Sequence, residues 1–200
     1  MSATWDERYG TETFYYGRDP NDFLVEHAAA IPRGGGVLCL AEGEGRNAVY
    51  LAGQGYRVTA VDRSAIGLQK ATRLARDLRV SISTAAADLT TYRIQPQQWD
   101  AIVSIWCHLP SRLRAAVHSQ VVEGLRPGGV FILEAYTPEQ LKHETGGPSV
   151  ADLMPTLAQL REELLGLEFE HGIELERTVQ EGQGHSGLSA VVQIVARKAT

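Results

Sequence analysis

A loop of alternating glutamates and glycines between two apolar segments constrains the fold of this chain more than any other feature. The short apolar run 37–40 leads into this loop, residues 41–45, and a helix is expected over 46–54. A second apolar segment, 57–61, then ends at Asp62, which follows the last loop glycine by 17 residues. This order is typical of the first half of a nucleotide-binding unit, in which an acidic residue at that distance binds both hydroxyls of a ribose. We therefore expect Asp62 either to bind a ribose or to cap the helix that follows it.

The loop glycines alone do not identify the nucleotide. Gly43 and Gly45 allow a close approach of the backbone to a ligand, and together with Ala48 they also satisfy the dinucleotide pattern G-x-G-x-x-G/A. The charge of the loop favours a different ligand, because Glu42 and Glu44 stand where a dinucleotide places its pyrophosphate. Carboxylates within roughly 4–6 Å of a diphosphate would each repel it by about 1–4 kcal/mol. S-adenosylmethionine has no phosphate and carries a sulfonium and an ammonium group, so it fits this loop better.

Strands and helices are expected to alternate along the chain, which predicts an α/β fold with a mostly parallel sheet between helices. Helices are expected at 21–30, 46–54, 65–78, 111–124 and 156–165, and strands at 37–40, 57–61, 81–86, 101–106, 130–135, 169–179 and 188–197. The last two strands are joined by a glycine-rich loop and predict an antiparallel hairpin at the sheet edge. We expect a single Rossmann-like, doubly wound domain over residues 1–200.

Composition narrows the class of protein. A chain of 200 residues with 44% hydrophobic residues can form one domain that buries roughly 70% of its unfolded surface. A net charge of −5 offers no basic surface for nucleic acid or an anionic membrane. No apolar run approaches the ~20 residues of a membrane helix, and we expect a cytoplasmic protein without membrane partners. Cys39 and Cys107 lie in apolar runs, which predicts reduced core thiols and no metal site.

Several segments together resemble the class I S-adenosylmethionine-dependent methyltransferases, in particular the small tellurite-resistance and thiopurine-methyltransferase-like group. The resemblance covers nearly the whole chain, and its matching segments are 5–9 (WDERY), 16–21 (YGRDPN), 42–47 (EGEGRN), Asp62, 87–89 (ADL) and 125–129 (LRPGG). The resemblance implies a seven-stranded sheet and methyl transfer that leaves S-adenosylhomocysteine. Cys39 and Ala41 depart from it, because the family usually has an acidic residue and a glycine there. Glu42 is then the expected partner of the methionine ammonium group.

The resemblance also assigns the rest of the cofactor site. Asp88 is expected to accept a hydrogen bond from the adenine amino group, with Leu89 supplying a backbone N–H, although Asp88 also suits a plain turn. Arg46 or Asn47 is expected to bind the methionine carboxylate, unless both lie on a solvated helix face. The predicted cofactor-binding residues are Ala41, Glu42, Gly43, Gly45, Arg46, Asn47, Asp62, Arg63, Asp88 and Leu89.

Three further segments are expected to surround the acceptor. His108 follows the fourth strand, where such enzymes place groups near the sulfonium, or it caps the segment before Pro110. The aromatic segment 1–20 either packs on the core as an arm or closes over the cofactor as a lid, with Tyr15 or Tyr16 near the methyl group; Tyr16 is the predicted catalytic residue. Residues 137–155 are expected to form a mobile loop, and 125–129 a turn.

Methyl transfer is an in-line displacement, so alignment and exclusion of water supply most of the catalysis. We predict a small-molecule acceptor, with a thiol or a selenium or tellurium oxyanion favoured, because a thiolate or such an oxyanion can attack without a base. A hydroxyl or amine would need a group such as His108 to receive its proton. The alternatives are an NAD(P)-dependent oxidoreductase and a non-catalytic S-adenosylmethionine-binding protein. We expect a monomer or homodimer and no nucleic-acid partner.

Overall fold

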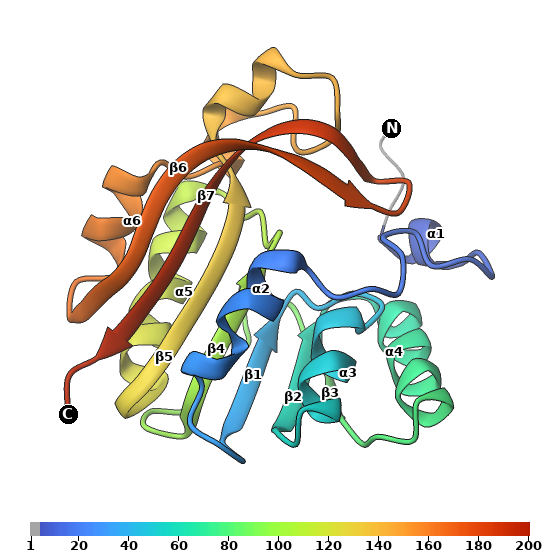
Figure 1. The fold of residues 1–200 in the computed structure, drawn as a ribbon, viewed down its shortest axis with the longest axis horizontal. Coiled ribbons are helices and arrows are strands. Elements are labelled where there is room, and N and C mark those ends of the chain that lie inside the picture. The colour runs from blue at the N-terminus through green and yellow to red at the C-terminus, as the bar shows by residue number, and fades with distance from the viewer. Residues whose placement is uncertain (1–4) are drawn as a thin grey trace.

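Seven strands form one mixed sheet that helices cover on both faces (Figure 1). The computed structural model describes residues 5–200. The strands lie in the order β3-β2-β1-β4-β5-β7-β6. Their bounds are Gly36–Leu40 for β1, Arg57–Asp62 for β2, Ser83–Ala86 for β3, Trp99–Ile105 for β4, Leu125–Tyr136 for β5, Leu167–Glu181 for β6 and His185–Lys198 for β7. Strands β1 to β5 are parallel, whereas β7 is antiparallel to both β5 and β6. The predicted fold class and the antiparallel edge hairpin are confirmed.

Some of the helices begin at a capping side chain. Their bounds are Trp5–Tyr9 for α1, Asp22–His27 for α2, Arg46–Gly53 for α3, Ala65–Asp77 for α4, Ser111–Gly124 for α5 and Leu157–Glu163 for α6. Asn21 accepts a hydrogen bond from the Leu24 N–H, and Ser64 accepts one from the Gly67 N–H, so each satisfies a free donor at a helix start. Among residues 5–200, no helix has the length and apolar character needed to span a bilayer.

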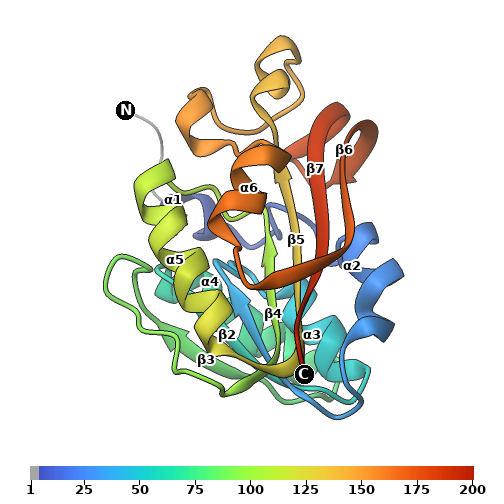
Figure 2. The same cartoon turned by 90° about the vertical axis from the view of Figure 1, so that its left-hand side faces the viewer.

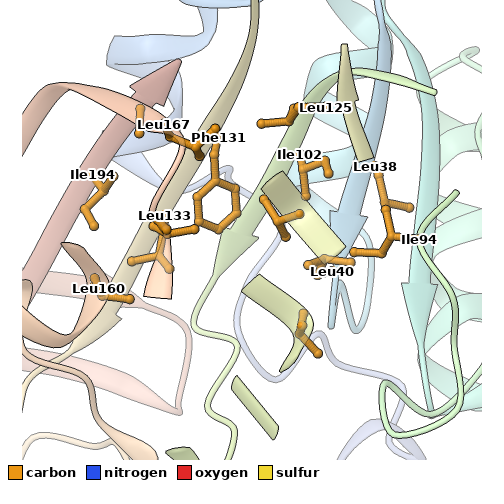
Figure 3. Close-up of a cluster of buried hydrophobic side chains, with 14 of the residues drawn as sticks. Leu38, Leu40, Ile94, Ile102, Leu125, Phe131, Leu133, Leu160, Leu167 and Ile194 are labelled. Atoms are coloured by element: carbon orange, nitrogen blue, oxygen red, sulfur yellow. The ribbon is translucent and has the colours of Figure 1, made fainter. Parts of the chain in front are cut away.

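Side chains of the parallel strands alternate between two buried layers. Leu38 and Leu40 face α5 and α6, together with Phe131 and Leu133 from β5 (Figure 3). Val37 and Cys39 face the opposite layer, which α2, α3 and α4 cover. Figure 2 shows α5 and α6 on one side of the sheet and α2 and α3 on the other. Because both faces are buried, these strands contain continuous apolar runs instead of polar alternation.

The expected turn at 125–129 is wrong, because β5 already begins at Leu125. Leu125 pairs with Trp99, and the next pair joins Val130 to Ala101, so residues 126–129 form an irregularity within the ladder. Gly128 has a φ of 78°, which is the conformation that a glycine was expected to provide there. Within 137–155 the structure has two short 3₁₀ helices, Pro138–Lys142 and Ala151–Leu153.

The tip of the β6–β7 hairpin meets the N-terminal segment above the carboxyl ends of the parallel strands (Figure 1). The backbone N–H of Gln183 donates to the carbonyl oxygen of Tyr15 at 2.8 Å. A Cβ atom at Gly182 or Gly184 would overlap Tyr15 or Tyr16, so only glycine allows this close approach. Segments from the two ends of the chain therefore enclose the edge of the sheet where ligands of open α/β folds bind.

Candidate active site

A cavity of about 570 Å³ lies at this edge of the sheet. Its volume is within the roughly 300–1,000 Å³ typical of small-molecule sites. The predicted site residues that line it are Tyr16, Ala41, Glu42, Arg46, Asn47, Asp62, Arg63, Asp88, Leu89 and His108. The structure therefore brings together side chains from the loops after β1, β2, β3 and β4 and from the N-terminal segment.

Gly43 and Gly45 are the predicted site residues that do not line this cavity. Both have a positive φ, of 59° and 89°. A Cβ atom at Gly43 would lie 2.6 Å from the hydroxyl oxygen of Tyr9, and one at Gly45 would overlap Ala71 of α4. The glycines thus allow Tyr9 and α4 to pack on the loop, which is a different reason from the close ligand approach that we expected.

The carboxylate of Asp62 is held in place at the end of β2. Its Oδ2 accepts a hydrogen bond from the Gly43 N–H at 2.9 Å, and its Oδ1 accepts one from the Ser64 N–H at 2.7 Å. Burial raises the pKa of Asp62, although these two N–H groups oppose the shift. Each oxygen has a second lone pair, so the fixed carboxylate can still accept hydrogen bonds from a ligand in the cavity.

Asp88 and Arg63 stand at the exposed end of the cavity. Asp88 Oδ1 accepts a hydrogen bond from the Thr90 N–H at 2.8 Å, which confirms its expected role in a turn. This hydrogen bond lowers the pKa of Asp88. Arg63 Nε lies 4.0 Å from Asp88 Oδ2, and the Arg63 side chain is exposed whereas Asp88 is half-buried. Leu89 follows on the same wall.

Glu42 occupies the centre of the loop. Its Oε1 accepts a hydrogen bond from the Ala48 N–H at 2.8 Å, at the start of α3. Burial raises the pKa of Glu42 to about 7, against the effect of this N–H and of the charge on Arg46. Ala41, just before it, has a φ of 49°, a region that favours glycine. The loop therefore places a half-buried carboxylate against the cavity on a strained backbone.

Arg46 and Asn47 are both buried, so the alternative of a solvated helix face is wrong. Arg46 Nη2 lies 2.5 Å from Glu181 Oε2 on the hairpin, and its Nη1 donates to the carbonyl oxygen of Asp19. Asn47 Oδ1 accepts a hydrogen bond from the Asn21 N–H at 2.9 Å. The start of α3 is therefore tied both to the N-terminal segment and to the C-terminal hairpin.

Glu44 has a structural role that the sequence did not indicate. It pairs with Lys70, and its Oε2 accepts a hydrogen bond from the Tyr15 N–H at 2.8 Å. Lys70 also donates to three carbonyl oxygens of the N-terminal segment, those of Tyr9, Thr11 and Thr13. Glu44 and Lys70 are each less than 10% exposed. Since Lys70 balances this charge, Glu42 alone remains to repel a diphosphate.

Tyr16 and Arg8 bring the N-terminal segment to the cavity. Arg8 Nη1 donates to the Tyr16 hydroxyl at 3.3 Å, and the guanidinium of Arg8 also lies over the rings of Trp5 and Tyr15. Burial raises the pKa of Tyr16. Because these residues line the cavity while Lys70 fixes the backbone behind them, the segment is both packed on the core and part of the cavity wall.

His108 lies in the loop between β4 and α5. Its Nδ1 is 3.3 Å from the carbonyl oxygen of Leu153, and its Nε2 is buried without a hydrogen-bond partner. Burial lowers the pKa of His108 to about 3, so the ring is neutral at pH 7 with Nδ1 as the donor. The alternative role as a helix cap is wrong, because α5 begins after Pro110 without a side-chain cap.

Trp106, Cys107 and His185 line the cavity but were not predicted. Trp106 has a φ of 57°, which is strained for a bulky residue and often marks a functional site. Its ring lies 4.9 Å from that of His185. Cys107 was expected in the core, but β4 ends before it, and burial raises its pKa to about 12. His185 gives no signal in the sequence, because hairpin curvature brings it to the site.

Among residues 5–200, no group of three or more His, Cys, Asp or Glu side chains could hold a metal ion. The cavity instead offers two kinds of wall. Carboxylates lie at the ends of β1, β2 and β3, whereas rings from the N-terminal segment, the loop after β4 and the hairpin line the other part.

Comparison with known proteins agrees with this architecture. Residues 37–129 match the family model of the methyltransferase domain. No curated protein sequence matches the chain. TehB from Haemophilus influenzae has a TM-score of 0.73 at 23% identity, and the match covers 97% of this chain and 65% of that one. An S-adenosylmethionine-dependent methyltransferase from Clostridium acetobutylicum has a TM-score of 0.69 at 14% identity, covering 98% of this chain and 96% of that one.

A third similar structure concerns the conversion of a disulfide bond into a thioacetal group during echinomycin biosynthesis. It has a TM-score of 0.75 at 18% identity, and the match covers 96% of this chain and 87% of that one. At these identities the structural neighbours show a shared fold, while the family model identifies the domain that holds the loop, β2 and β4. Residues 37–129 therefore match a methyltransferase domain, and the chain shares its fold with S-adenosylmethionine-dependent methyltransferases.

Proposed function

We propose that this methyltransferase acts on a small-molecule acceptor, and that a soft nucleophile is favoured, such as a thiol or a selenium or tellurium oxyanion. The observation that carries the proposal is the ring-lined part of the cavity, which Tyr16, Trp106 and His185 enclose beside the cofactor loop. The N-terminal segment and the hairpin tip meet directly above it, through Gln183 and Tyr15. Such an enclosure suits a small acceptor better than a segment of a polymer.

The carboxylate wall fits the adenosine part of S-adenosylmethionine. We assign the ribose hydroxyls to Asp62, whose two oxygens are fixed by backbone N–H groups and retain free lone pairs. We assign the adenine to Asp88 and to the backbone N–H of Leu89, at the end of the cavity where Arg63 also stands. Asp88 Oδ2 is the oxygen that remains for the adenine amino group, since Oδ1 serves the turn.

The loop after β1 fits the methionine part. Burial raises the pKa of Glu42 to about 7, and a bound ammonium group would restore the ionised form through a charge-assisted hydrogen bond. We assign the methionine carboxylate to the side-chain amide nitrogen of Asn47, because Arg46 is already paired with Glu181. Arg46 lies beside it. Ala41 contributes its main chain to the cofactor site, where the loop turns.

S-adenosylmethionine supplies a methyl group on a positively charged sulfur, which an acceptor can attack directly. The chain has to align the acceptor and exclude water. Tyr16 and His108 are proposed to contact the acceptor, because both line the cavity and Nε2 of His108 is an unused acceptor of hydrogen bonds. The sulfur chemistry described for the echinomycin-related structure supports a sulfur acceptor for this fold.

Two measurements test the proposal. Thermal unfolding is recorded with S-adenosylmethionine, S-adenosylhomocysteine, NAD and NADP added separately. At about 100 times its dissociation constant, a ligand adds ~2.7 kcal/mol, which raises the midpoint by roughly 5–10 °C for a chain of this size. We expect this shift with the two adenosyl compounds, and a shift with NAD or NADP instead would contradict the cofactor assignment.

Product mass is then measured with benzyl mercaptan and sodium selenite, against benzyl alcohol and benzylamine as matched acceptors. Methylation of the sulfur or selenium compounds at the higher rate supports the proposal. Faster methylation of the alcohol or the amine would refute the preference for soft nucleophiles.

A further inference from the structure

The structure assigns a proton-accepting pair to the hairpin tip: we infer that Nε2 of His185 takes the proton of a protonated acceptor, and that Glu181 is the positioning residue that orients this ring. The inference deepens the proposed methyl transfer and rests on it. Glu181 ends β6 and His185 begins β7, and the two residues are paired across the turn of the hairpin.

The geometry of the pair fixes the tautomer of the histidine. His185 Nδ1 lies 3.3 Å from Glu181 Oε2. A carboxylate can only accept at this position, so Nδ1 carries the proton and Nε2 keeps its lone pair. The ring lines the cavity, and its centroid lies 4.6 Å from that of Tyr16 and 4.9 Å from that of Trp106. A base in the acceptor part of the cavity is thus held by a carboxylate behind it.

Glu181 is held as an anion by several donors. Its Oε2 lies 2.5 Å from Arg46 Nη2 and 2.6 Å from Trp106 Nε1, and its Oε1 accepts a hydrogen bond from Asn21 at 2.8 Å. Although burial opposes ionisation, the hydrogen bond to His185 and the charge of Arg46 lower the pKa of Glu181 to about 2. The carboxylate therefore stays ionised and fixed at the pH at which a histidine base operates.

Trp106 gives an independent indication that this corner is built for function. A tryptophan at a φ of 57° persists only where the surroundings hold it, and here Glu181 and the carbonyl oxygen of Glu134 bind its side-chain and backbone N–H groups. These hydrogen bonds hold the indole between the hairpin and the cavity despite the strain. Trp106, which donates a hydrogen bond to Glu181, thus also forms the cavity wall beside His185.

His108 is the other histidine of the cavity, and it lacks these features. Its Nδ1 faces the carbonyl oxygen of Leu153 instead of a carboxylate. Burial lowers its pKa to about 3, so protonating it would leave a buried cation without a counter-charge. Nε2 of His108 is suited to accept a hydrogen bond from the acceptor, whereas His185 has Glu181 to stabilise the imidazolium that forms.

The charged groups around His185 come from three elements. Glu181 and the more distant Glu134 raise its pKa, whereas burial and Arg46 lower it, and the net shift is downward. The rings of Tyr16, Trp106 and Tyr136 cover its other sides. His185 is consequently neutral at pH 7 and available as a base.

Methyl transfer to a protonated acceptor is accompanied by proton transfer to His185. The attacking atom of the acceptor forms a bond to the methyl carbon, and the carbon–sulfur bond breaks with its electron pair moving to the sulfur. The proton of the acceptor passes to Nε2 of His185, and the imidazolium later releases it to water. An acceptor that is already an anion brings no proton and does not use this pair.

The kinetic test compares two thiols that differ in ionisation. Benzyl mercaptan keeps its proton at neutral pH, whereas 4-nitrothiophenol is largely ionised. We expect His185→Gln to lower kcat/KM for benzyl mercaptan by about 100-fold or more, the usual contribution of a general base, and to lower it far less for 4-nitrothiophenol. His108→Gln should slow both thiols by a similar factor. If His185→Gln lowers kcat/KM by the same factor for both thiols, the inference is overturned.

A measurement without turnover separates the inference from the proposed function. Histidine ¹⁵N spectra are recorded with S-adenosylhomocysteine bound, and His185 is assigned from the His185→Gln spectrum. We expect the Nδ1–H tautomer of His185 in the unaltered protein. The pKa of His185 should be lower in Glu181→Gln than in Glu168→Gln, which is a matched variant at an exposed position of the same strand. An Nε2–H tautomer in the unaltered protein would overturn the inference, whether or not Glu181→Gln folds.

If the unaltered protein binds S-adenosylhomocysteine but methylates neither thiol, the proposed acceptor class fails. The tautomer and the pKa of His185 still decide on the Glu181–His185 pair in that case.

Discussion

Replacing Glu44 by glutamine should loosen the N-terminal segment from the rest of the molecule. Glu44 and Lys70 form an ion pair in which each residue is less than 10% exposed. The substitution keeps the shape of the side chain and an oxygen for the Tyr15 N–H, but it removes the charge that balances Lys70. Breaking a buried pair by removing one partner costs about 3–5 kcal/mol, because the remaining charge stays uncompensated.

Two features of the site place the cost near the lower end of this range. Lys70 still donates to three carbonyl oxygens after the change, which are those of Tyr9, Thr11 and Thr13. The N-terminal segment can also detach and let water reach Lys70. We expect a loss of about 3 kcal/mol and a midpoint of thermal unfolding about 6–12 °C lower.

The assay combines thermal unfolding, hydrogen exchange and calorimetric titration with S-adenosylhomocysteine. Exchange should become faster in residues 5–17, and the affinity should fall because Tyr15 and Tyr16 line the cavity. Glu12→Gln is the matched control, since it removes the same charge from an exposed position of the same segment. A Glu44→Gln midpoint within about 1 °C of this control would refute the reasoning.

Three further outcomes are expected. Asp62→Asn should weaken S-adenosylhomocysteine binding about 10- to 100-fold, because hydrogen bonds to a charged group contribute about 1.5–3 kcal/mol, and an unchanged dissociation constant in calorimetry would count against the ribose assignment. Ala41→Gly should stabilise the protein against urea by about 0.5–1 kcal/mol, because the φ of 49° is strained for alanine, and a loss of stability would show that the methyl group is needed. The pKa of Glu181 is lowered from 4.5 to about 2, so its ionised form contributes about 3 kcal/mol above pH 4.5, and this contribution is lost as the pH falls toward 2. Urea unfolding of the unaltered protein and of Glu181→Gln should therefore converge on acidification, and a constant difference would disprove the linkage.

Local patterns predict the parallel half of the fold well. The apolar run 37–40, the loop after it and the acid at the end of β2 lie close together in sequence, so one segment contains the whole motif. Asn21 and Ser64 cap helices in the way that their residue types indicate. The lateral pairing of β7 between β5 and β6 agrees with the expected edge hairpin.

Roles that depend on distant partners could not be predicted. Glu42 and Glu44 look equivalent in the sequence, but only Glu44 meets a lysine, because α4 brings Lys70 against the loop. In the same way, the position of His108 after a strand predicts a site residue, whereas His185 reaches the site only through the curvature of the hairpin. Which tyrosine or histidine contacts the acceptor stays a prediction.

The pair of Arg46 and Glu181 joins residues that are 135 positions apart. During synthesis on the ribosome, α3 and the cofactor loop emerge long before the strand that neutralises Arg46. A nascent chain in which β1 to β5 are complete therefore has an arginine without its carboxylate partner and an unpaired β5 edge, and β6 and β7, which emerge later, supply the partners of both. Its cofactor site can reach the arrangement described here only once β6 and β7 have emerged, so the last folding step of this enzyme comes late in synthesis. A chaperone that shields the β5 edge would act on the intermediate that precedes this step.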